Sequence, residues 1–175
     1  MKIEYFSVNT SSSWWPQSRD LYMEAFPCDE RREPDELKAL AGTPGYEFYA
    51  IVKGGEFIGI LEVWEFSNFR FLEHLAIIPA LQGRGFGTII INDFVGKSDK
   101  PVYLEAEYPT TPIAKRRVQF YLNSGFVIAP FEYIQPPYYP NKNSVPMVLF
   151  VSNNSGIANI EQVVSTIKEN VYFHS

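Results

Sequence analysis

The stretch LAIIPALQGRGFG, residues 75–87, decides the fold of this chain. Three glycines at alternate positions follow Gln82, and an apolar segment with helical periodicity runs from there to Gly96. Glycine lets main-chain N–H groups come close to a ligand, and a helix N-terminus carries about half a positive charge. The pattern therefore predicts a strand, a loop that binds phosphate or pyrophosphate, and a helix. The alternative is a glycine-rich turn without a ligand.

Two familiar phosphate-binding loops fit this stretch poorly. A P-loop places Gly-Lys-Ser or Gly-Lys-Thr at the start of its helix, and that sequence is missing here. The dinucleotide fingerprint is Gly-x-Gly-x-x-Gly inside an opening strand–helix–strand unit. Here the glycines alternate, and antiparallel strands are predicted before them.

The residues before the stretch predict an antiparallel meander. A first strand lies around Ile3 and Tyr5, and two short helices follow, one from Pro16 to Phe26 and one from Pro34 to Gly42. Lys53-Gly54-Gly55-Glu56 is typical of a hairpin turn. Three consecutive strands are predicted around it: Tyr46–Val52, Phe57–Phe66 and Phe69–Ile78.

The residues after the stretch predict alternating strands and helices. A strand at Val102–Glu107 precedes a helix that Thr111 caps and Gly125 ends. Two last strands, Phe126–Tyr133 and Met147–Val151, complete the pattern. A strand–helix–strand succession implies a parallel pair of strands in this half.

The expected fold class is therefore α+β, with one mixed, twisted sheet of about six or seven strands and about four helices. Residues 1–151 form the predicted domain. Residues 152–175 form a predicted C-terminal extension, with a loop at 152–159 and a short amphipathic helix from Ile160 to Ile167. This helix is expected to pack on the domain or on a second copy of the chain, which leaves a homodimer open.

Composition narrows the class of function. The chain has 175 residues and a net charge of −5, which argues against binding nucleic acid through its phosphates. One cysteine rules out an internal disulfide, and two histidines make a zinc site improbable. No apolar run is long enough to cross a bilayer, and no signal peptide is visible. We expect a soluble, cytoplasmic protein without nucleic-acid or membrane partners.

Two segments together resemble a known family. Residues 75–87 are similar to the acetyl-coenzyme A signature of the GCN5-related N-acetyltransferases (GNAT), Gln/Arg-x-x-Gly-x-Gly/Ala. The segment RRVQFYLNSGF, residues 116–126, resembles the later helix of that family, which ends in Phe-Tyr-x-x-x-Gly-Phe. The resemblance covers roughly residues 1–151, and the order of predicted elements agrees with that fold.

The resemblance implies a cofactor site for acetyl-coenzyme A. In the family, the strand before the glycine loop separates from its parallel neighbour and pairs with the pantetheine arm, while the loop holds the pyrophosphate. One departure is Ala114, which stands where many members carry an asparagine that touches the cofactor. The cofactor-binding residues implied here are Leu75, Ala76, Ile77, Gln82, Gly83, Arg84, Gly85, Phe86 and Gly87.

Acetylating an amine requires removal of a proton from the amine, stabilisation of the thioester oxygen and protonation of the leaving thiolate. Tyr121 stands at the position of the family's general acid, and a phenol with a pKa of about 10 can protonate a thiolate. Without the motif, the sequence favours a core tyrosine on an apolar helix face at position 121. Cys28 has no nearby histidine, which makes a covalent acetyl-enzyme improbable.

The general base is predicted among three carboxylates. Strand alternation puts Phe71, Glu73, Leu75 and Ile77 on one face, so Glu73 is the first candidate. Glu62 and Glu105 are the second and third. His74 is expected on the opposite face, as a packed or hydrogen-bonded residue. The predicted catalytic pair is therefore Tyr121 and Glu73, with no metal.

These residues predict an N-acetyltransferase that moves acetyl from acetyl-coenzyme A directly to a primary amine, of a small molecule or a peptide, in a ternary complex. Near the expected acceptor side, Glu30 could hold a cationic acceptor, or Arg31 and Arg32 a carboxylate. Two alternatives stay open: a non-catalytic domain that binds or senses coenzyme A on the same fold, and an interaction module with an empty glycine loop.

Overall fold

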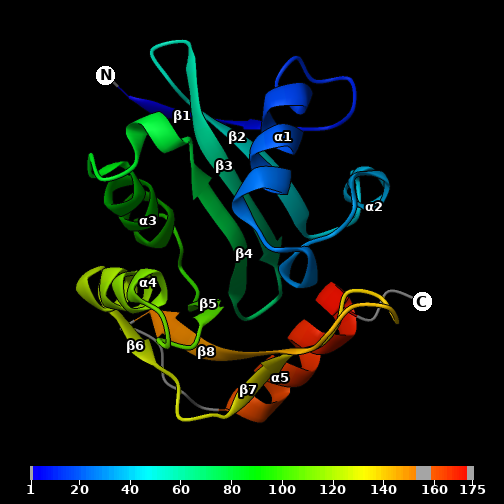
Figure 1. Cartoon of the computed structure of the whole chain (residues 1–175), viewed down its shortest axis with the longest axis vertical. Coiled ribbons are helices and arrows are strands. Elements are labelled where there is room, and N and C mark those ends of the chain that lie inside the picture. The colour runs from blue at the N-terminus through cyan, green and yellow to red at the C-terminus, as the bar shows by residue number, and fades with distance from the viewer. Residues whose placement is uncertain (1, 153–158, 173–175) are drawn as a thin grey trace.

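The computed structural model describes residues 2–152 and 159–172, which form one twisted sheet with helices on both faces (Figure 1). The strands are β1 (Ile3–Ser7), β2 (Tyr46–Lys53), β3 (Glu56–Glu65), β4 (Arg70–Ile77), β5 (Val102–Glu107), β6 (Phe126–Ile128), β7 (Tyr133–Gln135) and β8 (Val145–Ser152). The helices are α1 (Trp15–Ala25), α2 (Pro34–Ala39), α3 (Phe86–Gly96), α4 (Pro112–Asn123) and α5 (Ile160–Ile167).

The predicted α+β class with a mixed sheet is confirmed, and the sheet has eight strands. Their order is β1-β2-β3-β4-β5-β8-β6, with β7 also paired to β8. Strands β2, β3 and β4 form the predicted antiparallel meander, and β1 pairs antiparallel with β2. The implied parallel pair is β4 with β5. None of the helices in the described ranges has the length and apolarity that crossing a bilayer requires.

One predicted strand is divided in the structure. The segment Phe126–Tyr133 forms β6 and the first residue of β7, with an irregular connection between them. Pro130 lies in that connection, and proline has no N–H to donate to a strand ladder. Both short strands pair with β8, so the interruption bends this edge of the sheet without ending it.

The two faces of the sheet bury separate apolar cores. One core packs α1, α2 and α5 against the sheet, through residues such as Tyr22, Leu37 and Ile167. The other packs α3 and α4, through residues such as Ile90 and Val118. Anything that passes between two strands of this sheet therefore runs from the α3/α4 side to the α1/α5 side.

The C-terminal helix is part of the first core. Val163, Val164 and Ile167 of α5 are buried in it, and so are Val171 and Tyr172 of the π-helical turn (Lys168–Tyr172) that follows. The predicted loop at 152–159 lies almost wholly outside the described residues. The division of the chain at residue 151 stays a prediction.

Candidate active site

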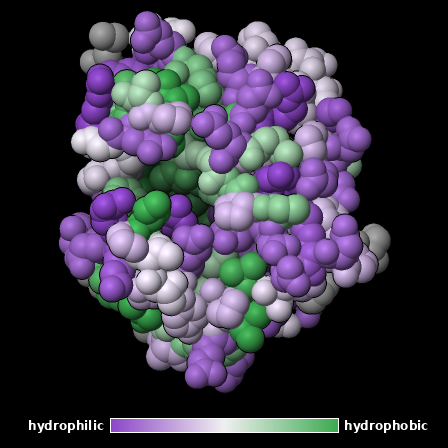
Figure 2. Space-filling view, in the orientation of Figure 1, coloured by the Kyte–Doolittle hydropathy of each residue, from purple (hydrophilic) through white to green (hydrophobic). Residues whose placement is uncertain are grey.

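A cleft of about 720 Å³ opens where β4 and β5 part. The two strands pair through only three residue pairs, from Arg70 with Val102 to Leu72 with Leu104, although both continue further. Beyond that point β4 keeps β3 on one side, and its other edge faces the cleft along Leu75–Ile77. Figure 2 shows the surface hollowed between α3 and α4, with apolar side chains deep in the hollow.

The glycine loop forms one wall of this cleft. Gly83 and Gly85 have φ angles of +74° and +82°, and a Cβ added at either would meet nothing within 4 Å. The loop is therefore open on its outer side, and its backbone angles favour glycine. No side chain caps α3, so the first N–H groups of this helix keep their capacity to bind an anion.

The other loop residues predicted to bind the cofactor take different positions. The Gln82 side-chain amide donates to the Ile77 carbonyl over 2.9 Å, which ties the loop to the end of β4. The whole predicted set lines the cleft except Arg84, whose side chain is exposed beyond it. Ala114, at the position of the family's asparagine, is buried, and its methyl group cannot form a hydrogen bond with a ligand.

Tyr121 reaches the cleft from α4, on the α3/α4 side of the sheet. Its ring packs between Phe126 and Phe150, with ring centroids 6.0 and 5.5 Å away. Within the described residues no group hydrogen-bonds to its hydroxyl, and the side chain lines the cleft. Burial raises the pKa of Tyr121, so the phenol keeps its proton and can donate it.

Four carboxylates line the end of the cleft towards α1 and α5, those of Glu30, Glu73, Glu105 and Glu107. Glu105 on β5 accepts a hydrogen bond at Oε1 from the Tyr172 hydroxyl, while its Oε2 is buried without a partner in the described chain. Burial raises the pKa of Glu105 to about 7. Burial and the neighbouring Glu107 carboxylate also raise the pKa of Glu30 to about 7. Arg117 pairs with Glu107 over 3.0 Å.

Glu30 is held over the cleft by contacts of its own turn, Cys28–Glu30. His74 shares a hydrogen bond of 2.8 Å between its Nε2 and the Glu30 carbonyl. Gln135 donates to the Asp29 carbonyl over 3.0 Å. The turn is thus attached to both halves of the sheet, β4 on one side and β7 on the other.

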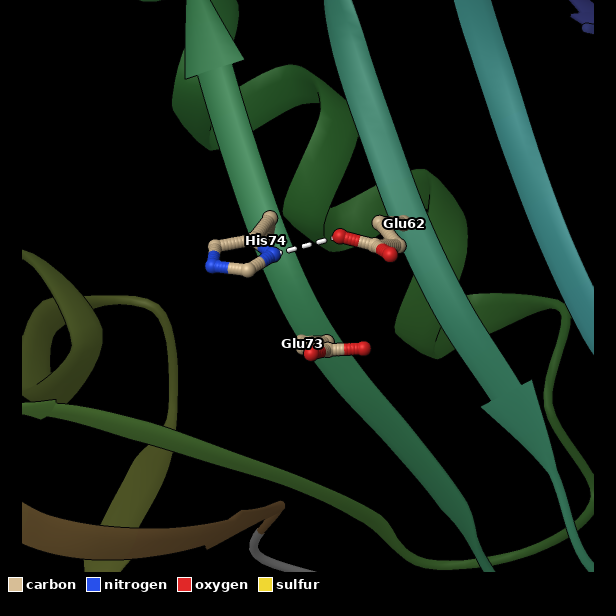
Figure 3. A group of neighbouring side chains, drawn as sticks. All are labelled: Glu62, Glu73 and His74. Atoms are coloured by element: carbon tan, nitrogen blue, oxygen red, sulfur yellow. Dashed lines mark hydrogen bonds and ion pairs between the residues drawn. The ribbon is translucent and has the colours of Figure 1, made fainter. Parts of the chain in front are cut away.

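A buried network of charges lies beneath these carboxylates. The Arg32 guanidinium donates to Glu73 at 2.5 Å and to Glu62 at 3.3 Å. His74 Nδ1 lies 2.5 Å from the second Glu62 oxygen, and Figure 3 shows this pair on neighbouring strands above Glu73. Burial lowers the pKa of His74, but the Glu62 and Glu73 carboxylates and the Glu30 carbonyl together outweigh burial, and the net shift is upward. Burial raises the pKa of Glu73, and the Arg32 guanidinium opposes that shift.

The contacts in this network bear on two questions, whether it could hold a metal ion and whether Glu73 could act as the predicted general base. Oxygen and nitrogen atoms of Glu62, Glu73 and His74 lie within 4.8 Å of one another, but Arg32 supplies the positive charge that a metal would bring. Both Glu73 oxygens are occupied, by Arg32, by Trp64 Nε1 at 2.6 Å and by the Tyr138 hydroxyl at 2.5 Å. Glu73 as the general base stays a prediction.

The strand alternation expected around Glu73 is wrong. A bulge between Glu62 and Val63 leaves Glu73 as the extra residue of β4, since Glu62 is opposite His74 and Val63 is opposite Leu72. Glu73 and His74 consequently share the α1/α5 side. Leu75 and Ile77 pack on the other side, with the α3/α4 core. Only contacts across strands reveal such a bulge.

Several residues of the site escaped the sequence reasoning. Tyr172 carries no motif, and its partner lies far away in the chain. Arg32 is expected from the sequence as a contact for an acceptor carboxylate, but in the structure its partners are the buried carboxylates of Glu62 and Glu73. Glu107 ends a predicted strand and Arg117 lies within a predicted helix, ten residues later. That spacing alone does not predict the ion pair between them. Glu105 is the third base candidate from the sequence, because it lies on the strand that follows the glycine loop and its helix.

The comparisons with known proteins agree with this geometry. The acetyltransferase (GNAT) family profile matches residues 15–126. No curated protein sequence matches the chain. A solved structure assigned to the GNAT acetyltransferases, from Bacteroides thetaiotaomicron, superposes with a TM-score of 0.91 at 28% identity, covering 98% of this chain and 99% of its own.

More distant structures share the fold. The ribosomal-protein-S18-alanine N-acetyltransferase of Escherichia coli has a TM-score of 0.60 at 17% identity, covering 89% of this chain and 96% of its own. A GNAT acetyltransferase from Elizabethkingia anophelis with acetyl-CoA bound has a TM-score of 0.59 at 16% identity, covering 86% and 97%. The open sheet between β4 and β5 and the glycine loop are thus parts of a fold that these acetyltransferases share. The chain belongs to the GNAT family of acetyltransferases.

Proposed function

We propose that this chain is an N-acetyltransferase that moves the acetyl group of acetyl-CoA directly to a primary amine in a ternary complex. The observation that carries the proposal is the placement of Tyr121 and Glu105 on opposite sides of the sheet, both lining the gap between β4 and β5. Amide formation needs a proton acceptor on the side of the amine and a proton donor on the side of the thiolate.

The cofactor is inferred to lie along the glycine loop and the free edge of β4. Acetyl-CoA, when bound, supplies the activated acetyl thioester. The uncapped start of α3 suits its pyrophosphate, and the main-chain groups of Leu75–Ile77 are free to pair with an amide-bearing arm. Among the described residues that line the cleft there is no cysteine or serine, which favours direct transfer over a covalent acetyl-enzyme.

Glu105 is proposed as the group that receives the amine proton at Oε2. A base with a pKa of about 7 is half ionised at neutral pH and still basic enough to accept a proton. Glu73 remains the base that the sequence predicted, but its two oxygens are engaged by Arg32, Trp64 and Tyr138. Geometry therefore ranks Glu105 above Glu73.

This assignment predicts the pH dependence of turnover. Glu105 must be ionised, so kcat/KM should fall about tenfold for each pH unit below 7. This fall of kcat/KM at low pH, the acid limb of the pH profile, should be missing from the residual activity of Glu105→Gln. Glu73→Gln serves as the comparison, and a limb that vanishes there but persists in Glu105→Gln would return the role to Glu73.

The glycine loop can be tested by binding alone. Gly85→Ala forces a Cβ into a left-handed conformation that costs an L-residue about 1–2 kcal/mol, so acetyl-CoA affinity should fall about tenfold. Gly96→Ala is the control, because that glycine also has open space but lies in α3 without a positive φ. Titration calorimetry measures both. Equal affinities would argue against cofactor binding at this loop.

The acceptor is proposed to be an amine because of the carboxylates at its end of the cleft, which favour a cationic group. Solved neighbours named as acetylating spermidine and a ribosomal-protein alanine fit this choice. A panel of primary amines with acetyl-CoA, followed by detection of released thiol, tests the proposal. Absence of thiol release from every amine, with acetyl-CoA bound, would contradict it.

A further inference from the structure

We infer that Tyr172 is a positioning residue for this reaction, and that the C-terminal turn thereby completes the acceptor end of the cleft. The inference rests on the proposed role of Glu105. Its starting point is the contact between the Tyr172 hydroxyl and Glu105 Oε1, two groups separated by 67 residues. Tyr172 is 5% exposed, so this contact is inside the protein.

The turn that carries Tyr172 is fixed by the buried charge network. The Val171 carbonyl accepts a hydrogen bond of 2.6 Å from Arg32 Nη2, and the same guanidinium holds Glu73. The Tyr172 ring packs on Tyr138, with ring centroids 4.9 Å apart. These two contacts hold the turn in the position from which the Tyr172 hydroxyl reaches Glu105.

The hydrogen bond gives the two Glu105 oxygens different tasks. Burial raises the pKa of Tyr172 well above its usual value, so its hydroxyl remains a donor at all physiological pH values. Oε1 is thereby occupied, and Oε2 is the oxygen left to take a proton from the cleft. A donor to the carboxylate also lowers the pKa of Glu105, which opposes the effect of burial.

Other groups around Glu105 act more weakly or are apolar. The Tyr133 hydroxyl on β7 lies near the carboxylate and lowers the pKa of Glu105, although it makes no hydrogen bond of normal geometry within the described chain. The charge of His74 on β4 also lowers this pKa, while Glu73 raises it. On β8, the residue opposite Glu105 is the apolar Leu149. Tyr172 is the largest of the influences that lower this pKa. Its removal should therefore move the titration of Glu105 upward.

The experiment uses the full chain with ¹³C-labelled glutamate side chains. Glu105 is assigned by the signal lost in Glu105→Gln and is then titrated by NMR. Tyr172→Phe should raise the Glu105 pKa by about one unit. The acid limb of kcat/KM, measured with the best amine of the panel, should move upward by the same amount. A single 3-fluorotyrosine at position 172 is a stronger donor and should move both downward.

Tyr138→Phe is the matched control, since it keeps a ring in the same stack and loses a hydrogen bond to Glu73 instead. It should leave the Glu105 titration in place. An unchanged Glu105 pKa in both Tyr172 variants, an equal shift in Tyr138→Phe, or a shift that the acid limb does not follow would each overturn the inference. The 3-fluorotyrosine variant keeps it testable if Tyr172→Phe does not fold.

NMR titration needs no acceptor, so its failure bears on Tyr172 alone. Failure of the proposed function would appear in the wild-type chain, as absence of thiol release or as an acid limb that survives in Glu105→Gln.

Discussion

Replacing Tyr121 with phenylalanine is expected to lower kcat by about 10²- to 10⁴-fold, the range that general acids contribute. The phenol is the proton donor that the cleft presents from the α3/α4 side, and burial raises its pKa, so it is protonated throughout the working range. Phenylalanine keeps the ring contacts with Phe126 and Phe150 and removes only the hydroxyl. The measurement is thiol release with the best amine of the panel.

Two observations separate lost chemistry from lost structure. Acetyl-CoA affinity, measured by calorimetry, should stay close to that of the wild type, because the cofactor site is assigned to the glycine loop. Tyr5→Phe, on β1 and away from the cleft, provides a matched change at a half-buried tyrosine. A Tyr121→Phe protein whose kcat stays within about threefold of wild type at every pH would remove Tyr121 as the acid.

The largest expected effect on stability belongs to Arg32. Arg32→Met leaves the Glu62 and Glu73 carboxylates buried without their shared cation, and breaking a buried pair costs about 3–5 kcal/mol. The free energy of unfolding in urea at neutral pH measures this loss. Adding Glu73→Gln to Arg32→Met should recover part of it, because Glu73 is the carboxylate left without a cation, whereas Glu62 keeps its contact with His74.

Arg19 provides the contrast that isolates burial. Its ion pair with Asp20 is 2.6 Å long, close to the 2.5 Å between Arg32 and Glu73, but both partners are largely exposed. Arg19→Met should therefore change the unfolding free energy by at most about 1 kcal/mol. If the two arginine variants lost equal stability, the network would have no special role in the core.

The glycine loop and the helix of Tyr121 were predictable because their information is local. Alternating glycines after a strand, and an apolar face that ends at Gly125, specify backbone angles and periodicity within a few residues. Thr111 is a similar case, since its hydroxyl accepts from the Ala114 N–H three residues later, as a helix cap should.

The arrangement around Glu73 was not predictable, because a bulge is a property of two strands. From the sequence of β4 alone, its side chains are expected to alternate between the two faces of the sheet. Only the pairing of β4 with β3 shows that one residue is extra. Because Glu73 is the extra residue, its side chain lies on the same side of the sheet as that of His74. A carboxylate expected beside the thioester became a partner of Arg32 in the core.

The sequence by itself determined the order of elements, the glycine loop and the family, since each follows from neighbours in the chain. Only the tertiary structure decided which carboxylate keeps an oxygen free. Glu73 and Glu105 are both glutamates on strands beside the cleft, and their difference comes from Arg32 and Tyr172, which folding brings in from distant segments. Burial and hydrogen bonds from such remote residues set the ionisation of a side chain, and no local pattern contains them.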